Sequence, residues 1–85
     1  MWVKTRKQLV NLDQCWTVLI DSFYRKDEQP LYALIAVVSG ANEGRVELET
    51  YDTLYDVREA YAYLHQCLAL NAALCDLPTK GAVKL

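Results

Sequence analysis

The stretch that decides the fold runs from residue 45 to residue 68 and reads RVELETYDTLYDVREAYAYLHQCL. Its first seven residues alternate between apolar and charged or polar side chains, which predicts a strand with one buried and one exposed face. Val46 and Leu48 are expected to face inward, and Glu49 is expected to face solvent. After Tyr51 the apolar period changes from two to three or four, which is the period of an α-helix.

The start of this helix is marked by Thr53 and Asp56, which have the spacing of a capping box. The helix is expected to begin at Leu54 and to dock one apolar row on a sheet: Leu54, Val57, Tyr61, Leu64 and Leu68. A second apolar row flanks the first: Ala60, Tyr63, Cys67, Leu70 and Leu74. Because two rows form a wider apolar face than one small sheet covers, self-association is predicted.

The end of the helix has two interpretations. Asn71 is suited to a C-terminal cap, whereas a longer helix would continue for one more turn to Cys75. Residues 76–85 are expected to form a loose arm of a single domain that spans residues 1–85.

Three more strands are expected before the opening stretch. Residues 2–5 are β-prone, residues 15–23 alternate and are rich in β-branched and aromatic side chains, and residues 31–38 are apolar without interruption. A turn is expected after the first strand, and Asn11 and Asp13 favour a bend or bulge near residues 11–13, because their side chains stabilise turns. The predicted fold class is α+β: one antiparallel sheet of about four strands in ββββα meander order, with one long amphipathic C-terminal helix packed on one face.

Composition limits the class of protein. Hydrophobic residues make up 53% of the 85 residues and charged residues 24%, which excludes an intrinsically disordered chain. Three cysteines without a paired spacing fit neither a disulfide-stapled module nor a zinc site, so reduced thiols and a cytoplasmic location are expected. The net charge of −2 does not favour nucleic acid, and no apolar stretch approaches the roughly 18 residues of a membrane span.

No sequence motif assigns a catalytic, cofactor-binding or metal-binding residue. Phosphate-binding glycine loops, nucleophile elbows and zinc or calcium motifs are absent, so enzymatic activity is not favoured. The only histidine, His65, lies two positions from Cys67 on the predicted helix, and the two side chains therefore point in different directions. Glu47 and Glu49 share a predicted strand face at about 6.6–6.8 Å, but a solvated face is the simpler interpretation of such a pair.

Two segments resemble a known group of proteins. Trp2-Val3-Lys4-Thr5 followed by Leu9-Val10-Asn11-Leu12, and Tyr51-Asp52-Thr53 leading into a helix with Ala60, are similar to small uncharacterised proteins of bacteria, phages and mobile elements, including mobile gene cassettes. The resemblance implies a strand meander followed by a single helix. It brings no activity, cofactor or site residue.

Three functions stay open from the sequence. The first is a non-enzymatic interaction module that forms a homodimer, with its interface at Tyr63, Cys67, Leu70 and Leu74. The second is a small-molecule-binding protein or small enzyme whose pocket, between sheet and helix, is expected at Trp16, Tyr61 and His65, with Cys15 as a further polar group. The third is a nucleic acid accessory factor of a mobile element that uses residues 2–7.

Overall fold

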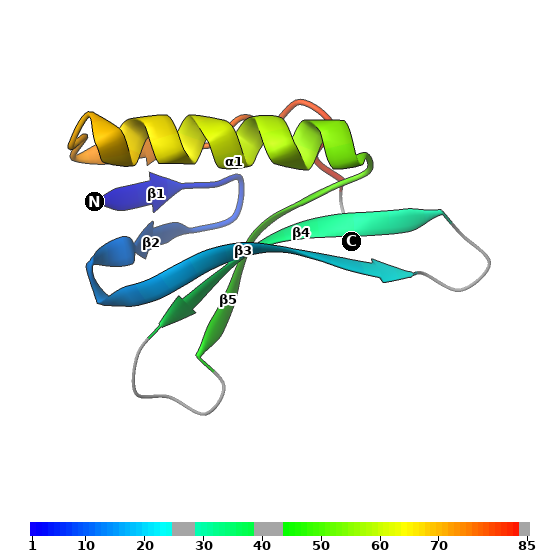
Figure 1. Ribbon diagram of the computed structural model, residues 1–85, viewed down its shortest axis with the longest axis horizontal. Helices are drawn as coiled ribbons and strands as arrows, with labels where there is room; N and C mark the ends of the chain where they lie inside the picture. Colours follow the sequence, from blue (N-terminus) through cyan, green and yellow to red (C-terminus); the bar gives the residue numbers. More distant parts are fainter. Residues whose placement is uncertain (25–28, 39–43, 84–85) are drawn as a thin grey trace.

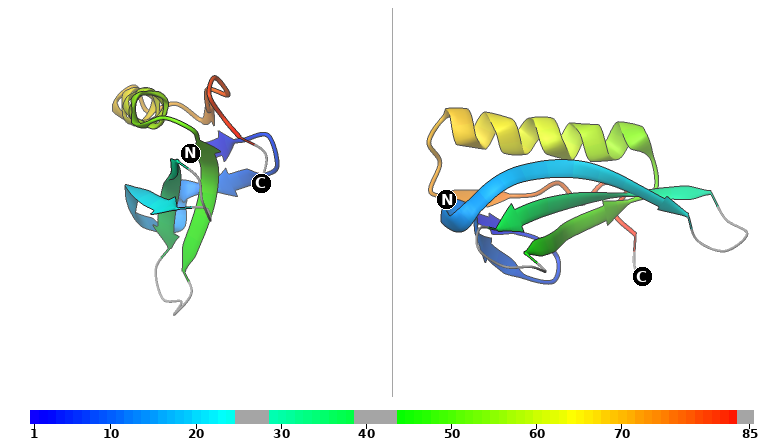
Figure 2. Two further views of the ribbon diagram at one scale, coloured as in Figure 1. Left: turned by 90° about the vertical axis from the view of Figure 1, so that its right-hand side faces the viewer. Right: turned by 60° about the horizontal axis from the view of Figure 1, so that its bottom comes forward.

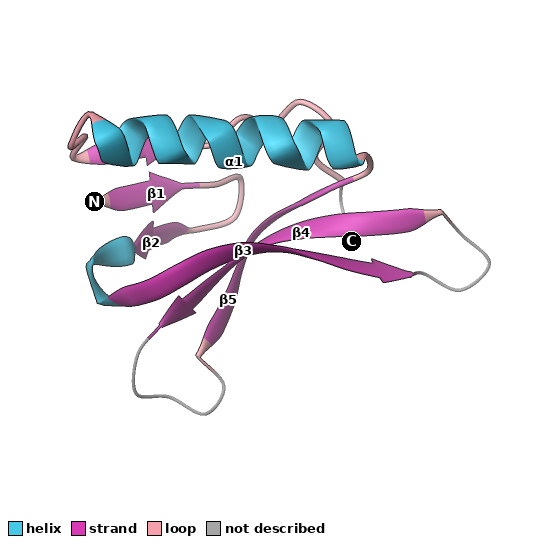
Figure 3. Ribbon diagram, viewed as in Figure 1, coloured by secondary structure: helices cyan, strands magenta, loops and turns pink. Residues whose placement is uncertain are grey.

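The computed structural model describes residues 1–24, 29–38 and 44–83. The elements follow one another along the chain as shown in Figure 1 and Figure 3: β1 (Trp2–Lys4), β2 (Leu9–Asn11), the 3₁₀-helix η1 (Leu12–Gln14), β3 (Cys15–Tyr24), β4 (Pro30–Val38), β5 (Arg45–Tyr51), α1 (Leu54–Ala69) and β6 (Leu74–Asp76). The α+β class with antiparallel strands and one helix is confirmed, and so is the helix start at Leu54.

The six described strands form two sheets of three strands, with the orders β2-β1-β6 and β3-β4-β5 (Figure 2). The single four-stranded meander predicted from the sequence is therefore wrong. The chain leaves the first sheet at η1, where the Asn11 side chain accepts a hydrogen bond of 3.0 Å from the backbone N–H of Asp13. This turn ends β2 and redirects the chain, so β3 pairs with β4. Alternation shows which segments are strands, but it does not select their partners.

The β2-β1-β6 sheet is the smaller of the two, because each of its strands has three residues. Its third strand, β6, follows the helix and pairs with β1 in parallel. The residues after it are packed as well. Leu77 is 2% exposed and its N–H donates to a β1 carbonyl, and the N–H of Val83 donates to a β5 carbonyl. The expectation of a loose arm over residues 76–85 is therefore corrected for residues 76–83, because strands on both sides supply hydrogen-bond partners.

A β-bulge in the β4–β5 ladder reverses the predicted direction of Glu49. The register passes from Leu34 opposite Glu49 to Ile35 opposite Glu47, so Leu48 is the additional residue. Leu48 and Glu49 are consequently both buried, at 2% and 3% exposed. Alternation places Glu49 in solvent only if the ladder contains no extra residue. Glu47 and Glu49 therefore do not form a carboxylate pair on one face.

The helix α1 lies over the β3-β4-β5 sheet and beside β6 (Figure 2). Its buried residues come from both predicted apolar rows: Val57, Ala60, Leu64 and Cys67. The prediction that the first row docks on the sheet is therefore only partly correct, since Tyr61 and Leu68 remain 41% and 50% exposed. The core between the helix and the two sheets also takes residues from β1, β4, β5 and β6.

Both ends of α1 are capped. The Thr53 hydroxyl oxygen accepts a hydrogen bond of 3.0 Å from the N–H of Asp56, as predicted. At the other end, the N–H groups of Asn71 and Ala72 donate to carbonyls of the last turn, which is a Schellman motif. Asn71 has the left-handed φ of 56° that this motif requires. The helix therefore stops before Asn71 and does not continue to Cys75.

Candidate functional site

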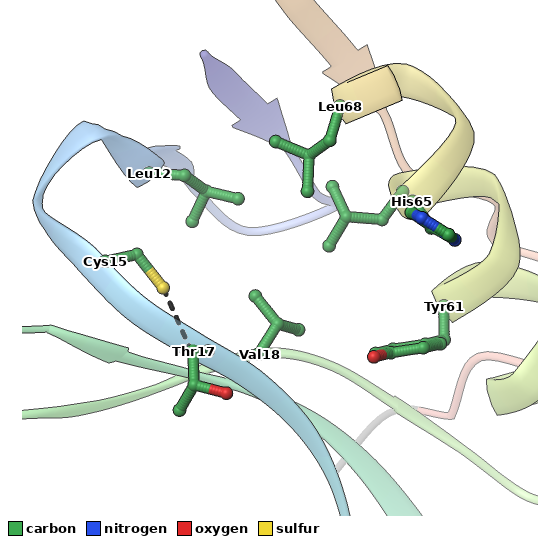
Figure 4. Close-up of a pocket in the computed structure, with 8 residues that line it drawn as sticks. Leu12, Cys15, Thr17, Val18, Tyr61, His65 and Leu68 are labelled. Atoms are coloured by element: carbon green, nitrogen blue, oxygen red, sulfur yellow. Dashed lines mark hydrogen bonds between the residues drawn. The ribbon is translucent and has the colours of Figure 1, made fainter. Parts of the chain in front are cut away.

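A groove of about 290 Å³ lies between α1 and the start of β3 (Figure 4). Its helix wall consists of Tyr61, Leu64, His65 and Leu68. The opposite wall belongs to η1 and β3 and consists of Leu12, Cys15, Thr17 and Val18. The floor is apolar, because Leu12 and Leu64 are 8% and 1% exposed, whereas the rim carries an imidazole, a phenol, a hydroxyl and a thiol.

The helical repeat brings the residues of one wall together. Tyr61, His65 and Leu68 follow one another at spacings of four and three, so they share one side of α1. On the other wall, the register of β3 against β4 shifts between Cys15 and Thr17. A bulge at this position bends the strand, and the bend lies at one end of the groove.

The polar groups of the groove lie apart from one another. The Cys15 thiol donates a hydrogen bond of 3.0 Å to the carbonyl oxygen of Thr17 (Figure 4). Among the described residues, no hydrogen bond joins His65 to Cys15 or to Tyr61. A nucleophile and its activating base need such a contact. An apolar floor with separate polar groups on the rim is instead the usual composition of a ligand site.

Two of the three residues predicted for a pocket, Tyr61 and His65, line this groove. The side chain of the third, Trp16, lies outside the described part of the structure. Cys15, expected as a further polar group, lines the groove as well, whereas sequence reasoning did not assign the remaining lining residues to a pocket: Leu12, Thr17, Val18, Leu64 and Leu68. Leu12 lies within the bend predicted at residues 11–13, but no sequence signal shows that η1 turns its side chain under the helix.

The residues predicted for a dimer interface differ in their exposure to solvent. Tyr63, Leu70 and Leu74 are 41%, 75% and 53% exposed, but Cys67 is 8% exposed and belongs to the core. The interface role of Cys67 is therefore corrected, because the helix turns this part of its row inward. Leu74 lies opposite Trp2 in the parallel β1–β6 register, and Trp2 is 45% exposed. Trp2 and Leu74 thus share the outer face of the smaller sheet.

A second depression, of about 280 Å³, lies on another side of α1. It is lined by Tyr55, Asp56, Glu59, Tyr63, Pro78 and Lys80. None of these side chains is buried, and Tyr55 is 65% exposed. Unlike the groove, this depression therefore has no buried floor.

An ion pair joins the two sheets away from the groove. Arg6 donates from Nε to Glu49 Oε2 at 3.1 Å and from Nη2 to Glu49 Oε1 at 2.9 Å. Burial alone would raise the pKa of Glu49, but the hydrogen bonds and charge of Arg6 outweigh burial and lower that pKa. The side chain of Gln8 adds a hydrogen bond of 2.6 Å to the carbonyl of Glu47. These contacts hold the β1–β2 turn against β5 and so stabilise the arrangement of the two sheets.

Comparisons with known proteins give no family. No protein-family model matches the chain, and neither a curated protein nor a solved structure matches it. Over residues 1–24, 29–38 and 44–83, no group of His, Cys, Asp and Glu side chains is arranged to hold a metal ion. In this same part of the chain, no helix has the length and apolarity needed to cross a membrane. The predicted mobile-element origin stays a prediction.

Proposed function

We propose that this protein is a non-enzymatic binding protein that takes an apolar ligand into the groove between α1 and β3. One observation carries the proposal: a buried floor at Leu12 and Leu64 lies beneath a rim that exposes Tyr61 and His65. Burial of apolar surface supplies the driving force for such a ligand, and a few polar groups set its orientation.

The thiol of Cys15 provides a direct test, because it lines the groove, whereas Cys67 and Cys75 are 8% and 0% exposed. The protein is equilibrated with a mixture of small aromatic, alkyl and polar disulfides in the presence of a mild thiol reductant. Intact mass spectrometry then identifies the mixed disulfides that form through thiol exchange. We expect aromatic and alkyl groups to be captured in preference to polar groups of equal thiol reactivity.

Two lysine variants control this experiment. Leu68 and Leu70 are both exposed, at 50% and 75%, but only Leu68 lines the groove. We expect Leu68→Lys to reduce the capture of apolar groups and Leu70→Lys to leave it unchanged, while Cys15→Ser removes it. Equal capture of polar and apolar groups by the wild-type protein would overturn the proposal.

A second proposal is self-association through the outer face of the smaller sheet. Trp2 and Leu74 lie opposite each other there, and both are about half exposed. Neighbouring apolar side chains at a protein surface often mark an interface. Light scattering across a dilution series should give a dimer mass that Leu74→Lys lowers to a monomer, with Leu68→Lys remaining dimeric. A wild-type monomer at every concentration would contradict self-association.

Nucleic acid binding by residues 2–7 has less support. Arg6 is engaged by Glu49, and Lys4 lies opposite Asp76 in the β1–β6 register. These neighbouring carboxylates reduce the positive charge that a phosphate backbone would meet. Oligonucleotide binding that weakens as salt is added would favour this function again.

A further inference from the structure

Strand β3 leaves one edge unpaired beside the groove. It is an outer strand of the β3-β4-β5 sheet and is ten residues long. The N–H of Cys15, at the start of β3, donates to the carbonyl of Leu12 in η1. Among the described residues, the rest of β3 pairs its backbone with β4 alone. Proteins commonly shorten, charge or cover such an edge, because it is a template for another strand. Besides the exposed Asp21, β3 carries the half-buried apolar residues Leu19, Ile20 and Phe23.

The helix α1 runs along β3, and the groove lies between the two elements (Figure 2; Figure 4). An extended chain that pairs with the edge of β3 would therefore pass beneath Tyr61, His65 and Leu68. Successive side chains of a strand point to opposite faces. Every second side chain of the added strand would then point toward the groove, as in peptide recognition by strand addition.

The volume of the groove favours part of a chain over a complete small ligand. At about 290 Å³, it lies at the lower limit of the roughly 300–1,000 Å³ that small-molecule sites enclose. A groove of this volume accommodates one large side chain or two small ones. The remaining affinity would come from backbone hydrogen bonds along β3.

No carboxylate is among the residues that line the groove, and one arginine lies on α1 beyond them. Arg58 lies one turn before Tyr61 and two turns before His65 on the same side of α1. Over the described residues, Arg58 makes no ion pair. The carboxylates next to and within β3 already have partners, since Asp13 bonds to the N-terminal amino group and Asp21 bonds to a β5 arginine at 2.8 Å. A carboxylate on the ligand would therefore meet a cation that has no carboxylate of its own.

We propose that the occupant of the groove is an extended peptide segment of another protein. The segment adds as a strand to the free edge of β3, inserts an apolar side chain between Val18 and Leu68, and presents a carboxylate to Arg58. This inference rests on the proposed function, because it names the ligand class of the same groove.

The test begins with the whole chain and a display library of random linear peptides of about ten residues, a length that covers one strand. A selected peptide is synthesised together with analogues that carry an N-methyl group at each backbone nitrogen in turn. Because alternate N–H groups of an added strand pair with the edge, methylation at every second position should weaken binding about five- to tenfold, and the positions between should tolerate it.

Matched variants locate the bound peptide. Arg58→Glu should weaken binding about tenfold through charge reversal, whereas Lys80→Glu, an exposed charge outside the groove, should not. Leu68→Lys should abolish binding and Leu70→Lys should preserve it. Amide NMR signals of residues 17–23 should shift when the peptide is added.

Other results would overturn the inference and separate it from the proposed function. Failure to select a peptide, or equal tolerance of methylation at all positions, excludes strand addition. If Cys15 still captures apolar groups, the groove remains a ligand site for small molecules; if it does not, both proposals fail. Concentration-dependent shifts of residues 17–23 without peptide would show that a second copy occupies the edge.

Discussion

Arg6 and Glu49 lie 43 residues apart in the chain, and two hydrogen bonds, of 3.1 Å and 2.9 Å, join their side chains. The pair connects the turn after β1 to the bulge in β5, and so connects one sheet to the other. The bulge is what makes the contact possible, because it turns Glu49 from the solvent-facing position that alternation predicts toward the first sheet.

Replacing Glu49 with Gln should destabilise the protein by roughly 1.5–3 kcal/mol at neutral pH, the range for hydrogen bonds to charged groups. The folded protein lowers the pKa of Glu49, so the stabilisation is full above the ordinary value of 4.5 and is lost as the pH falls through the lowered pKa. Denaturant unfolding at several pH values measures this effect. The difference between wild type and Glu49→Gln should decrease below pH 4.5, and a constant difference would contradict the ion-pair explanation.

Tyr51 should limit stability at high pH. Its side chain is fully buried and its hydroxyl donates a hydrogen bond of 2.7 Å to the carbonyl of Pro78. Burial raises the pKa of Tyr51 above its ordinary value of 10.0, so this contribution is complete below pH 10 and is lost above it. Tyr51→Phe should cost about 0.5–1.5 kcal/mol at pH 7. It should also flatten the fall in unfolding free energy above pH 10, and equal slopes for both proteins would contradict this prediction.

The left-handed residue after α1 should discriminate between two small side chains. Asn71→Ala should lower stability by about 1 kcal/mol, because alanine is disfavoured at a φ of 56°. Asn71→Gly should retain the wild-type stability, since glycine adopts this conformation without steric cost. Thermal unfolding of the two variants provides the comparison. Equal melting temperatures would show that the left-handed backbone conformation at Asn71 does not affect the stability of the protein.

The three cysteines should react at different rates with an aromatic disulfide reagent. Cys15 lines the groove and should react in the folded protein, whereas Cys67 and Cys75 should react only as the protein opens. Burial, assisted by the hydrogen-bonding contact with Cys67, raises the pKa of Cys75 to about 12, which leaves little reactive thiolate at pH 8. Cys15→Ser should remove the fast phase. A second fast thiol in the wild type would contradict the packing of the core.

Much of the local structure was predictable from local sequence. Alternation identified β5, and the spacing of Thr53 and Asp56 identified the first turn of α1. The sheet topology was not predictable in the same way, because β6 is a segment of three residues whose partner lies at the other end of the chain. Short strands carry little periodicity, and their pairing depends on long-range packing.

The groove was accessible to sequence reasoning mainly on its helix side, and Cys15 is the one residue of the strand side that was expected at a pocket and lines it. Tyr61 and His65 are one helical turn apart, so periodicity alone places them together. Leu12 reaches the groove through a 3₁₀ turn, and Cys67 turns toward the core because the sheet lies under one part of its row. Both outcomes depend on the positions of the two sheets beneath the helix. The helical period carries no information about these positions.

The pairing of β1 with β6 also has a kinetic consequence. The β3-β4-β5 sheet is built from neighbouring strands and involves short chain closures, whereas β1 receives its second partner only after residues 74–76 have been made. Closing so large a loop carries a greater entropy cost and slows folding. During synthesis on the ribosome, the apolar inner face of β1 would therefore stay uncovered until β6 has been made. A nascent chain stalled before residue 74 should remain sensitive to proteases at β1 and β2.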